Sequence, residues 1–470
     1  MASVVVTGAG LIGLSTAMLL AKDGHQVTVL ERDPSPPTPP GEAWDDWERR
    51  GVGQFRLLHI LLPRVRKVAD VELPEVVAGL DAAGGLRMNP LAGVPAELTG
   101  GVRPGDEDLE FVTARRPVSE AVWATIAAAT PGVTIRRGVG IRGVLTGADV
   151  ASGVPHVVGL VTEAGEEIRA DLVVDATGRR SSLGSWLAAA GARPVVEEID
   201  DVGFVYYGRH FRSNDGSTPP AIGGLLQAYE SLSLLTLPAD NGTWGVGIIT
   251  SAHDRQLRVL KDLDTWTTAV KSYPLIAHWL DGEPLDDEVA TFAKLEDRLR
   301  TFVVDGQPVA TGILSVGDSW ACTNPSLGRG ISIGMMHAVA LRDLLRRQAL
   351  DDPMALALAW HEETLATVEP YVRGTMRFDR HRLAQIDAEI EGVPYEPNDP
   401  AWDLVECLGA GAVADPDLLR GMMAVASVLA TDEEVLSRPG IADKALAIGG
   451  PLRKEPAPGP TREQLLAVLG

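Results

Sequence analysis

The fold is decided by one stretch of the chain, residues 4–31, which has the sequence VVVTGAGLIGLSTAMLLAKDGHQVTVLE. Its first four residues form a β-branched run, which is typical of a buried parallel strand. Three glycines follow within a short turn, and apolar residues then recur at helical spacing until Gly24 and His25. A second apolar run, Val27 to Leu30, predicts another strand. This order of strand, turn, helix and strand predicts the start of a Rossmann-like parallel sheet.

Each glycine of the turn has its own expected task. Gly8 permits a tight turn out of the strand, Gly10 lets the backbone approach a pyrophosphate, and Gly13 lets the helix pack closely on the sheet. The helix N-terminus, around Leu11 and Ile12, offers free N–H groups and the positive end of a dipole to phosphates. The turn therefore predicts a dinucleotide site.

Glu31 stands at the end of the second strand, 18 residues after Gly13. A carboxylate there can accept hydrogen bonds from a ribose hydroxyl, and it disfavours a 2′-phosphate. FAD and NAD both fit this stretch taken alone. The alternative is a glycine-rich turn that holds no ligand.

Length and composition narrow the function classes. The chain has 470 residues, enough for two or three domains, and its 64 acidic and 42 basic residues give a net charge of −22. That charge argues against nucleic acid or an anionic membrane as partner, and it favours a small molecule. Two cysteines, Cys322 and Cys407, cannot build a disulfide framework or a cysteine metal cluster, and we expect no metal. Polar residues interrupt the run from Val4 to Leu20, so we expect no signal peptide, no membrane span and a cytoplasmic location.

The rest of the chain predicts three regions. Residues 54–68 have a helical pattern that Pro63 must break or restart. From about Glu197 alternation predicts an antiparallel sheet, with a hairpin turn at Ala239-Asp-Asn-Gly242. The expected fold class is α/β: a Rossmann-like domain (residues 1–190 and 301–350), an inserted antiparallel β-sheet substrate domain (191–300) and a mostly helical C-terminal region (351–470).

The predicted strand over residues 205–212 carries candidate substrate contacts. Tyr207 and Arg209 share one of its faces, and Tyr206 and His210 share the other. One face should line the substrate cavity, and alternation alone does not say which. We take Tyr207 and Arg209 as candidate catalytic residues; the alternative for each is packing within the sheet's own core.

Two later segments each place a polar, glycine-containing turn after a buried strand. The first, residues 170–179, has the sequence ADLVVDATGR, and the second, residues 317–330, has the sequence GDSWACTNPSLGRG. Together with the N-terminal stretch they resemble the FAD-dependent monooxygenases of the para-hydroxybenzoate hydroxylase type. The Asn-Pro-x-x-Gly-x-Gly ending resembles the epoxidase-like branch, and residues 51–59 (GVGQFRLLH) are similar to a stretch of that branch. The resemblance covers roughly residues 1–350.

The resemblance implies an activity. It implies that FAD is the cofactor and that one oxygen atom of O₂ enters a hydrophobic or aromatic small molecule, a secondary metabolite, by hydroxylation or epoxidation through a flavin C4a-hydroperoxide. Asp318 would accept hydrogen bonds from the ribityl chain, and Arg115 would reach back to the cofactor. Pro325 would lie beside the flavin ring, and the helix that begins near Ile331 would stabilise negative charge on the reduced flavin.

The implied site is as follows. The candidate cofactor-binding residues are Gly8, Gly10, Leu11, Ile12, Gly13, Glu31, Arg32, Gln54, Arg115, Asp175, Gly178, Gly317, Asp318, Gly328, Arg329, Gly330 and Ile331. The candidate catalytic residues are Pro325, Gly328, His59, Tyr207 and Arg209. For Asp175 the alternative is a strand-end cap, for Arg115 a solvated helix start, and for His59 a structural histidine.

Departures from the family pattern leave several points open. Asp175 and Gly178 are separated by two residues where the aromatic hydroxylases have adjacent Asp-Gly. Two sources of electrons are therefore open: NAD(P)H as the direct reductant, or a separate flavin reductase. Trp44-Asp-Asp-Trp47 lacks the Trp-x-Trp-x-Ile-Pro of flavin-dependent halogenases, so halogenation is not expected. The rival hypotheses are an FAD-dependent reductase or dehydrogenase of a carbon–carbon double bond, and a flavin-binding interaction protein without redox activity. A homodimer is also open.

Overall fold

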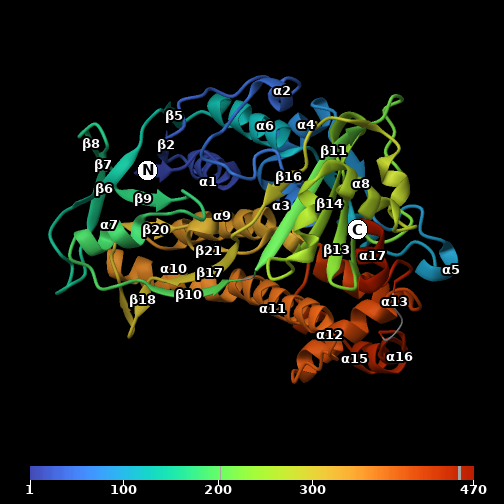
Figure 1. The fold of residues 1–470 in the computed structure, drawn as a ribbon. Helices are drawn as coiled ribbons and strands as arrows, with labels where there is room; N and C mark the ends of the chain where they lie inside the picture. Colours follow the sequence, from blue (N-terminus) through green and yellow to red (C-terminus); the bar gives the residue numbers. More distant parts are fainter. Residues whose placement is uncertain (202, 454–456) are drawn as a thin grey trace.

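A five-stranded parallel sheet lies at the centre of the N-terminal part of the molecule (Figure 1). The structure is a computed structural model, and it describes residues 1–201, 203–453 and 457–470. The strand order is β20-β9-β1-β2-β5, and each neighbouring pair is parallel. The strands are β1 (Ser3–Thr7), β2 (Gln26–Glu31), β5 (Val133–Arg137), β9 (Leu172–Asp175) and β20 (Ile313–Ser315). The predicted Rossmann-like sheet is confirmed, with β1 in its middle.

The two faces of this sheet are covered differently. Helices pack on one face because their apolar residues form one buried cluster with those of β1 and β9. An antiparallel sheet and a short helix pack on the other face. The first group is α1 (Leu11–Lys22), α3 (Pro63–Glu72), α4 (Pro74–Ala82), α6 (Arg116–Ala129) and α9 (Gly330–Arg347); the second is β6 (Ile141–Thr146), β7 (Val157–Thr162), β8 (Glu167–Arg169) and α7 (Leu183–Ala189).

The segment before α3 differs from its sequence pattern. Residues 54–62 precede the helix instead of belonging to it, and α3 begins at Pro63. Proline is well suited to the first turn of a helix, since its missing N–H has no intrahelical partner there. The remaining short elements of this part are α2 (Ala43–Asp46), β3 (Leu86–Met88), α5 (Ala96–Thr99) and β4 (Phe111–Thr113).

The second sheet is antiparallel, as predicted. It runs β12-β13-β14-β11-β15, with β16 also paired to β11, and α8 (Leu263–Lys271) covers one of its faces. The turn between β13 and β14 is the expected hairpin, and Asn241 adopts a positive φ of 51° there. The strands are β11 (Phe204–Arg212), β12 (Leu226–Tyr229), β13 (Leu232–Pro238), β14 (Thr243–Ser251), β15 (Glu283–Pro284) and β16 (Ala290–Phe292).

A three-stranded sheet connects the two larger ones. β10 (Val196–Asp201), β17 (Glu296–Thr301) and β21 (Ala321–Cys322) pair in that order. The sheet therefore joins strands from both sides of the boundary expected near residue 300. A separate hairpin consists of β18 (Val303–Val304) and β19 (Gln307–Pro308).

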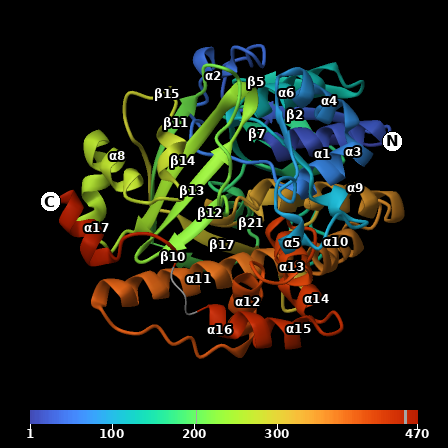
Figure 2. The same cartoon turned by 90° about the vertical axis from the view of Figure 1, so that its right-hand side faces the viewer.

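The C-terminal region is helical, as predicted. Three of its helices begin with Asp-Pro, in which the aspartate caps the free N–H groups and proline occupies the first turn. The longest helix passes below the three-stranded sheet and below β12 and β13 (Figures 1 and 2). The helices are α10 (Pro353–Thr367), α11 (Glu369–Glu391), α12 (Pro400–Gly411), α13 (Pro416–Ala426), α14 (Asp432–Leu436), α15 (Ile441–Lys444), α16 (Gly450–Leu452) and α17 (Arg462–Leu469). Within the described residues, no helix combines the length and apolar character needed to cross a membrane.

Candidate functional site

The glycine turn after β1 contains two glycines that the packing requires and one that leaves space. A Cβ on Gly8 would overlap the carbonyl oxygen of Ala176, and Gly8 has a φ of +97°, where L side chains are strained. A Cβ on Gly13 would overlap the carbonyl oxygen of Gly8. Gly10 is different, because no described heavy atom lies within 4 Å of the position of its Cβ. The open space is at the N-terminus of α1, where a phosphate group would be favoured.

The first turn of α1 makes contact with the other end of the candidate site. Gly10 is the N-cap residue, and no side chain among the described residues caps the helix. The side chain of Ile12 fills the space that a Cβ on Gly317 or Gly334 would enter, at 3.1 Å and 2.6 Å from its atoms. The free N–H groups of α1 therefore lie close to the segment of residues 317–330, which contains Gly317.

Glu31 lies buried at the end of β2 and already has protein donors. The N–H groups of Ala9 and Asp33 each donate to its carboxylate at 2.9 Å, and Arg49 Nη2 donates to Oε2 at 2.5 Å. Arg49 also donates to Glu120 at 2.5 Å and to the carbonyl of Ala9 at 3.3 Å. The sequence analysis missed Arg49, which lies in a loop where no spacing pattern distinguishes it.

Asp175 ends β9 next to the glycine turn and is completely buried. Its Oδ1 accepts hydrogen bonds from the N–H and hydroxyl of Thr177, at 3.0 and 2.6 Å. The hydroxyls of Thr7 and Ser181 also donate to this carboxylate. Of the two roles considered for Asp175, these contacts favour the strand-end cap. Gly178 follows in the same turn with a φ of +82°.

Gly317 and Asp318 follow β20, and a buried histidine holds their backbone. The N–H of Gly317 donates to Nδ1 of His337 at 3.1 Å, and the other ring nitrogen is 3.0 Å from the hydroxyl of Thr364. Burial lowers the pKa of His337 to about 3, so the ring is neutral at pH 7. Since Nδ1 accepts, Nε2 carries the hydrogen and donates to Thr364. The sequence analysis missed His337 because it lies among core residues of α9.

The carboxylate of Asp318 has no hydrogen-bond donor among the described residues. Its Oδ1 is 3.8 Å from the position of a Cβ on Gly330. Burial raises the pKa of this carboxyl, and three nearby arginine side chains oppose the rise. Arg300 donates to the carbonyls of Asp318 and Ser319 at 3.3 and 2.8 Å, so it fixes the turn without using the carboxylate. A half-buried carboxylate that no described residue donates to can accept hydrogen bonds from a ligand that carries hydroxyl groups.

The loop from Asn324 to Gly330 leads into α9. Pro325 is exposed, and Gly328 has a φ of +65° with Ile60 3.2 Å from the position of its Cβ. The guanidinium of Arg329 turns away and donates to Thr375 and to the carbonyl of Val425. Only the backbone of Arg329 is therefore free to serve the predicted cofactor role. Gly330 and Ile331 form the first turn of α9, whose N-terminal end faces Asp318.

The two faces of β11 are now distinguished, and the candidate catalytic residues Tyr207 and Arg209 lie on the face that packs on α8. Tyr207 packs in the cluster beneath α8. Arg209 lies 5.7 Å from the ring centre of Trp266 on α8 and donates to the carbonyl of Asp286 at 2.7 Å. The opposite face carries Tyr206, whose hydroxyl donates to Asn324 of the loop at 2.7 Å.

The same face of β11 also carries His210. Its Nδ1 and its backbone N–H both contact Asp286 Oδ2, at 3.1 and 2.6 Å, and the edge of its ring meets Trp44 at 4.7 Å between ring centres. Leu58 fills a hollow next to His210, where the sheet lacks side chains because it contains glycines. Those glycines are Gly208, Gly245 and Gly247.

Arg115 and His59 are both held in surroundings that the structure describes. Arg115 forms a buried ion pair with Asp240, with Nη2 2.7 Å from Oδ2, and its guanidinium lies 4.7 Å from the ring centre of Trp44. Its Nη1 is buried and has no partner among the described residues. Burial lowers the pKa of His59 to about 3, which makes it neutral at pH 7. These contacts exclude the solvated helix start for Arg115.

The structure shows few contacts for two of the predicted cofactor residues, Arg32 and Gln54. Arg32 is exposed just after β2. Gln54 is half-buried in the loop before α3, where its carbonyl accepts a hydrogen bond from Leu57 N–H at 3.2 Å.

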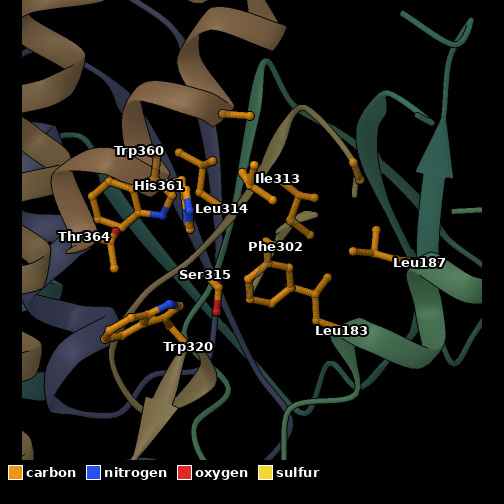
Figure 3. A pocket seen from close by; sticks show the side chains of 13 residues that line it. Leu183, Leu187, Phe302, Ile313, Leu314, Ser315, Trp320, Trp360, His361 and Thr364 are labelled. Atoms are coloured by element: carbon orange, nitrogen blue, oxygen red, sulfur yellow. The ribbon is translucent and has the colours of Figure 1, made fainter. Parts of the chain in front are cut away.

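A small apolar cavity lies beside β20 and Trp320 (Figure 3). Side chains of α7, β20 and α10 point into it, among them Leu187, Leu314 and Trp360 (Figure 3). Its volume is about 30 Å³. The cavity lies in the packing between the parallel sheet and α10.

Comparison with known proteins shows that the chain is similar to a family model, to another protein's sequence and to solved structures. Residues 3–44 match the family model described as FAD dependent oxidoreductase. Protein Rv3254 of Mycobacterium tuberculosis is 26% identical over 386 residues, which cover 78% of this chain and 77% of that protein. Among solved structures, the flavin-dependent brominase Bmp2 is 17% identical with a TM-score of 0.59, covering 96% of this chain and 99% of the other. OxyS, the anhydrotetracycline hydroxylase from Streptomyces rimosus, is 19% identical with a TM-score of 0.56, covering 91% of this chain and 76% of the other.

These likenesses establish the fold. The α/β architecture, with its parallel Rossmann-like sheet, inserted antiparallel sheets and helical C-terminal region, is confirmed. The solved structures with this fold include a hydroxylase and a flavin-dependent brominase. The match to the FAD dependent oxidoreductase model covers the first strand, the glycine turn, the first helix and the second strand.

Proposed function

We propose that this chain is an FAD-dependent monooxygenase that inserts one oxygen atom of O₂ into a hydrophobic or aromatic small molecule. One observation carries the proposal: the half-buried carboxylate of Asp318 receives no hydrogen bond from the described residues, and it lies between the open N-terminus of α1 and that of α9. FAD has a pyrophosphate for the first helix, hydroxyl groups for the carboxylate and a ring for the second helix.

The cofactor residues divide into three groups under this proposal. Gly10 and the N–H groups that follow it receive the pyrophosphate, and Glu31 with Arg49 forms the adjoining wall. Asp318 accepts hydrogen bonds from the ribityl hydroxyls. The backbone of Gly328 and Gly330 borders the ring, and the N-terminal end of α9 stabilises negative charge on it.

The substrate lies on the Tyr206 and His210 face of β11. Leu58 covers the glycines of that face, and together with Trp44 it makes the surface there apolar. The imidazole of His210, oriented by Asp286, supplies a polar contact at its edge. Bound flavin supplies the reaction with O₂; the chain itself orients the substrate and excludes water. The Asn324–Gly330 loop favours the epoxidase-like branch, and hydroxylation is the other outcome.

Rapid mixing tests the proposal. Protein loaded with FAD is reduced without oxygen and then mixed with oxygenated buffer, with and without candidate apolar substrates. A transient near-ultraviolet absorbance band before oxidised flavin returns supports a monooxygenase, and ¹⁸O from ¹⁸O₂ should then appear in the product. Direct return to oxidised flavin under all conditions, with a double bond changed in the product, supports the reductase or dehydrogenase instead. Reduction by NADH or NADPH alone, compared with reduction by an added flavin reductase, identifies the electron source.

A further inference from the structure

Two aspartates lie beneath the Asn324–Gly330 loop, and both are completely buried. Asp297 belongs to β17 and Asp379 belongs to α11 of the C-terminal region, and each is 0% exposed. In each carboxyl group Oδ1 accepts hydrogen bonds, whereas Oδ2 is buried and without a partner among the described residues. Buried carboxylate oxygens are costly to leave unpaired, so this arrangement requires an explanation.

Asn324 bridges the two carboxyl groups. Its backbone N–H donates to Asp297 at 2.6 Å, and its side-chain Nδ2 donates to Asp379 at 3.0 Å. The hydroxyl of Ser326 also donates to Asp379, at 2.7 Å, and Tyr206 donates to the side-chain oxygen of Asn324. The first turn of the loop is therefore held by two acids and one phenol.

The charged groups around the pair do not neutralise it. Arg329 is directed to Thr375 and Val425, and Arg380 is paired with the glutamate and aspartate of β10. The other titratable neighbours are uncharged or acidic: Tyr206, Cys322 and Asp200. Two buried carboxylates that one asparagine bridges, without a paired cation, oppose each other's ionisation. Burial raises the pKa of Asp297 to about 6, and burial with the charge of Asp297 raises the pKa of Asp379 well above its usual range.

We infer that Asp297 and Asp379 hold one proton between them at neutral pH, on Asp379, and that this carboxyl pair positions the Asn324–Gly330 loop. The proton occupies Oδ2 of Asp379, since Oδ1 accepts from two donors. Sharing a proton keeps one negative charge beneath the loop instead of two. The loop's role toward flavin rests on the proposed function, whereas the protonated pair does not depend on it.

The protonation is tested on the protein without flavin, by infrared difference spectroscopy of the carboxylic-acid C=O stretch in H₂O and D₂O. We expect a band at pH 7 that D379N removes and that the exposed α11 control E391Q keeps. In D297N the band should persist but titrate at lower pH, because the like charge is gone. Absence of a D379N-sensitive band, or an unchanged titration in D297N, overturns the shared proton.

The positioning role is tested by comparing two substitutions of the same residue. D379N keeps an acceptor for Asn324 and Ser326 and stays neutral, whereas D379A removes the acceptor. We expect FAD affinity within about twofold of the parent in D379N and weakened about tenfold in D379A, with both variants folded by circular dichroism. Equal weakening in both variants overturns the positioning role. If no variant, nor the parent, binds FAD, the proposed function fails while the infrared result stands.

Discussion

Acid should destabilise this protein partly through His337, and the structure gives the size of the effect. The ring is completely buried, its Nδ1 accepts from Gly317 N–H, and it stacks on Trp360 at 4.5 Å between ring centres. Protonation would place an uncompensated charge there and abolish the acceptor. We therefore compare the parent with H337N, which keeps an acceptor near Nδ1, and with H337F, which does not. Neither variant titrates at this position.

The magnitude follows from the difference between folded and unfolded pKa values. Burial lowers the pKa of His337 from 6.5 to about 3, so the unfolded chain binds the proton first as the pH falls. The folded state is favoured fully above pH 6.5 and loses this contribution progressively towards pH 3. Between pH 7 and pH 5 the loss is about 2 kcal/mol in the free energy of unfolding.

Urea unfolding at pH 7 and pH 5, followed by tryptophan fluorescence, measures this difference. Both variants should be less stable than the parent at pH 7, because H337N loses ring packing and H337F also leaves Gly317 N–H unpaired. Their decrease from pH 7 to pH 5 should nevertheless be smaller than the parent's by about 2 kcal/mol. His59 titrates in all three proteins and cancels. An equal decrease in the parent and both variants would refute the buried neutral imidazole.

Three further substitutions test the site. Replacing Gly10 with valine fills the open space at α1, so FAD affinity should fall at least about 100-fold, while urea unfolding shows a change of about 1 kcal/mol or less. Asp175→Asn removes the negative charge to which Thr177 and Ser181 donate, and calorimetry should show a loss of about 1–3 kcal/mol in the free energy of unfolding. Tyr206→Phe should alter substrate or oxygen reactivity in rapid mixing, whereas Tyr207→Phe on the opposite face should leave both within about twofold; the reverse order would contradict the assignment of faces.

Local features of the sequence predicted the strand, turn and helix of residues 4–31. The positions of Gly8, Gly13 and Asp318 depend on strand, turn and helix order within short segments, which a sequence displays directly. Gly10 is the informative case, because the structure leaves open space exactly where the pattern predicts a phosphate to approach. The helical pattern before Pro63 was misleading, since apolar residues at helical spacing also occur in this loop, whose Leu58 and Ile60 pack with Leu237.

The sequence could not predict which residues far apart in the chain pack against one another. Alternation along β11 predicts two faces and does not distinguish them. Only the folded chain shows that α8 packs on the face of Tyr207 and Arg209. Asp379 lies 55 residues from Asn324, and only the course of α11 brings them together. His337 occupies a core position of α9, where nothing in the spacing distinguishes an imidazole that supports Gly317 from ordinary packing.

The central claim, that these loops bind FAD, is tested most directly by comparing FAD with FMN in equilibrium fluorescence titrations of the flavin-free protein. FMN shares the ring and ribityl chain but lacks the adenosine half that the Gly10 turn and Glu31 are proposed to bind. We predict one FAD per chain, bound at least about 100-fold more tightly than FMN. Equal affinity for the two flavins, or no binding of FAD, would contradict the account.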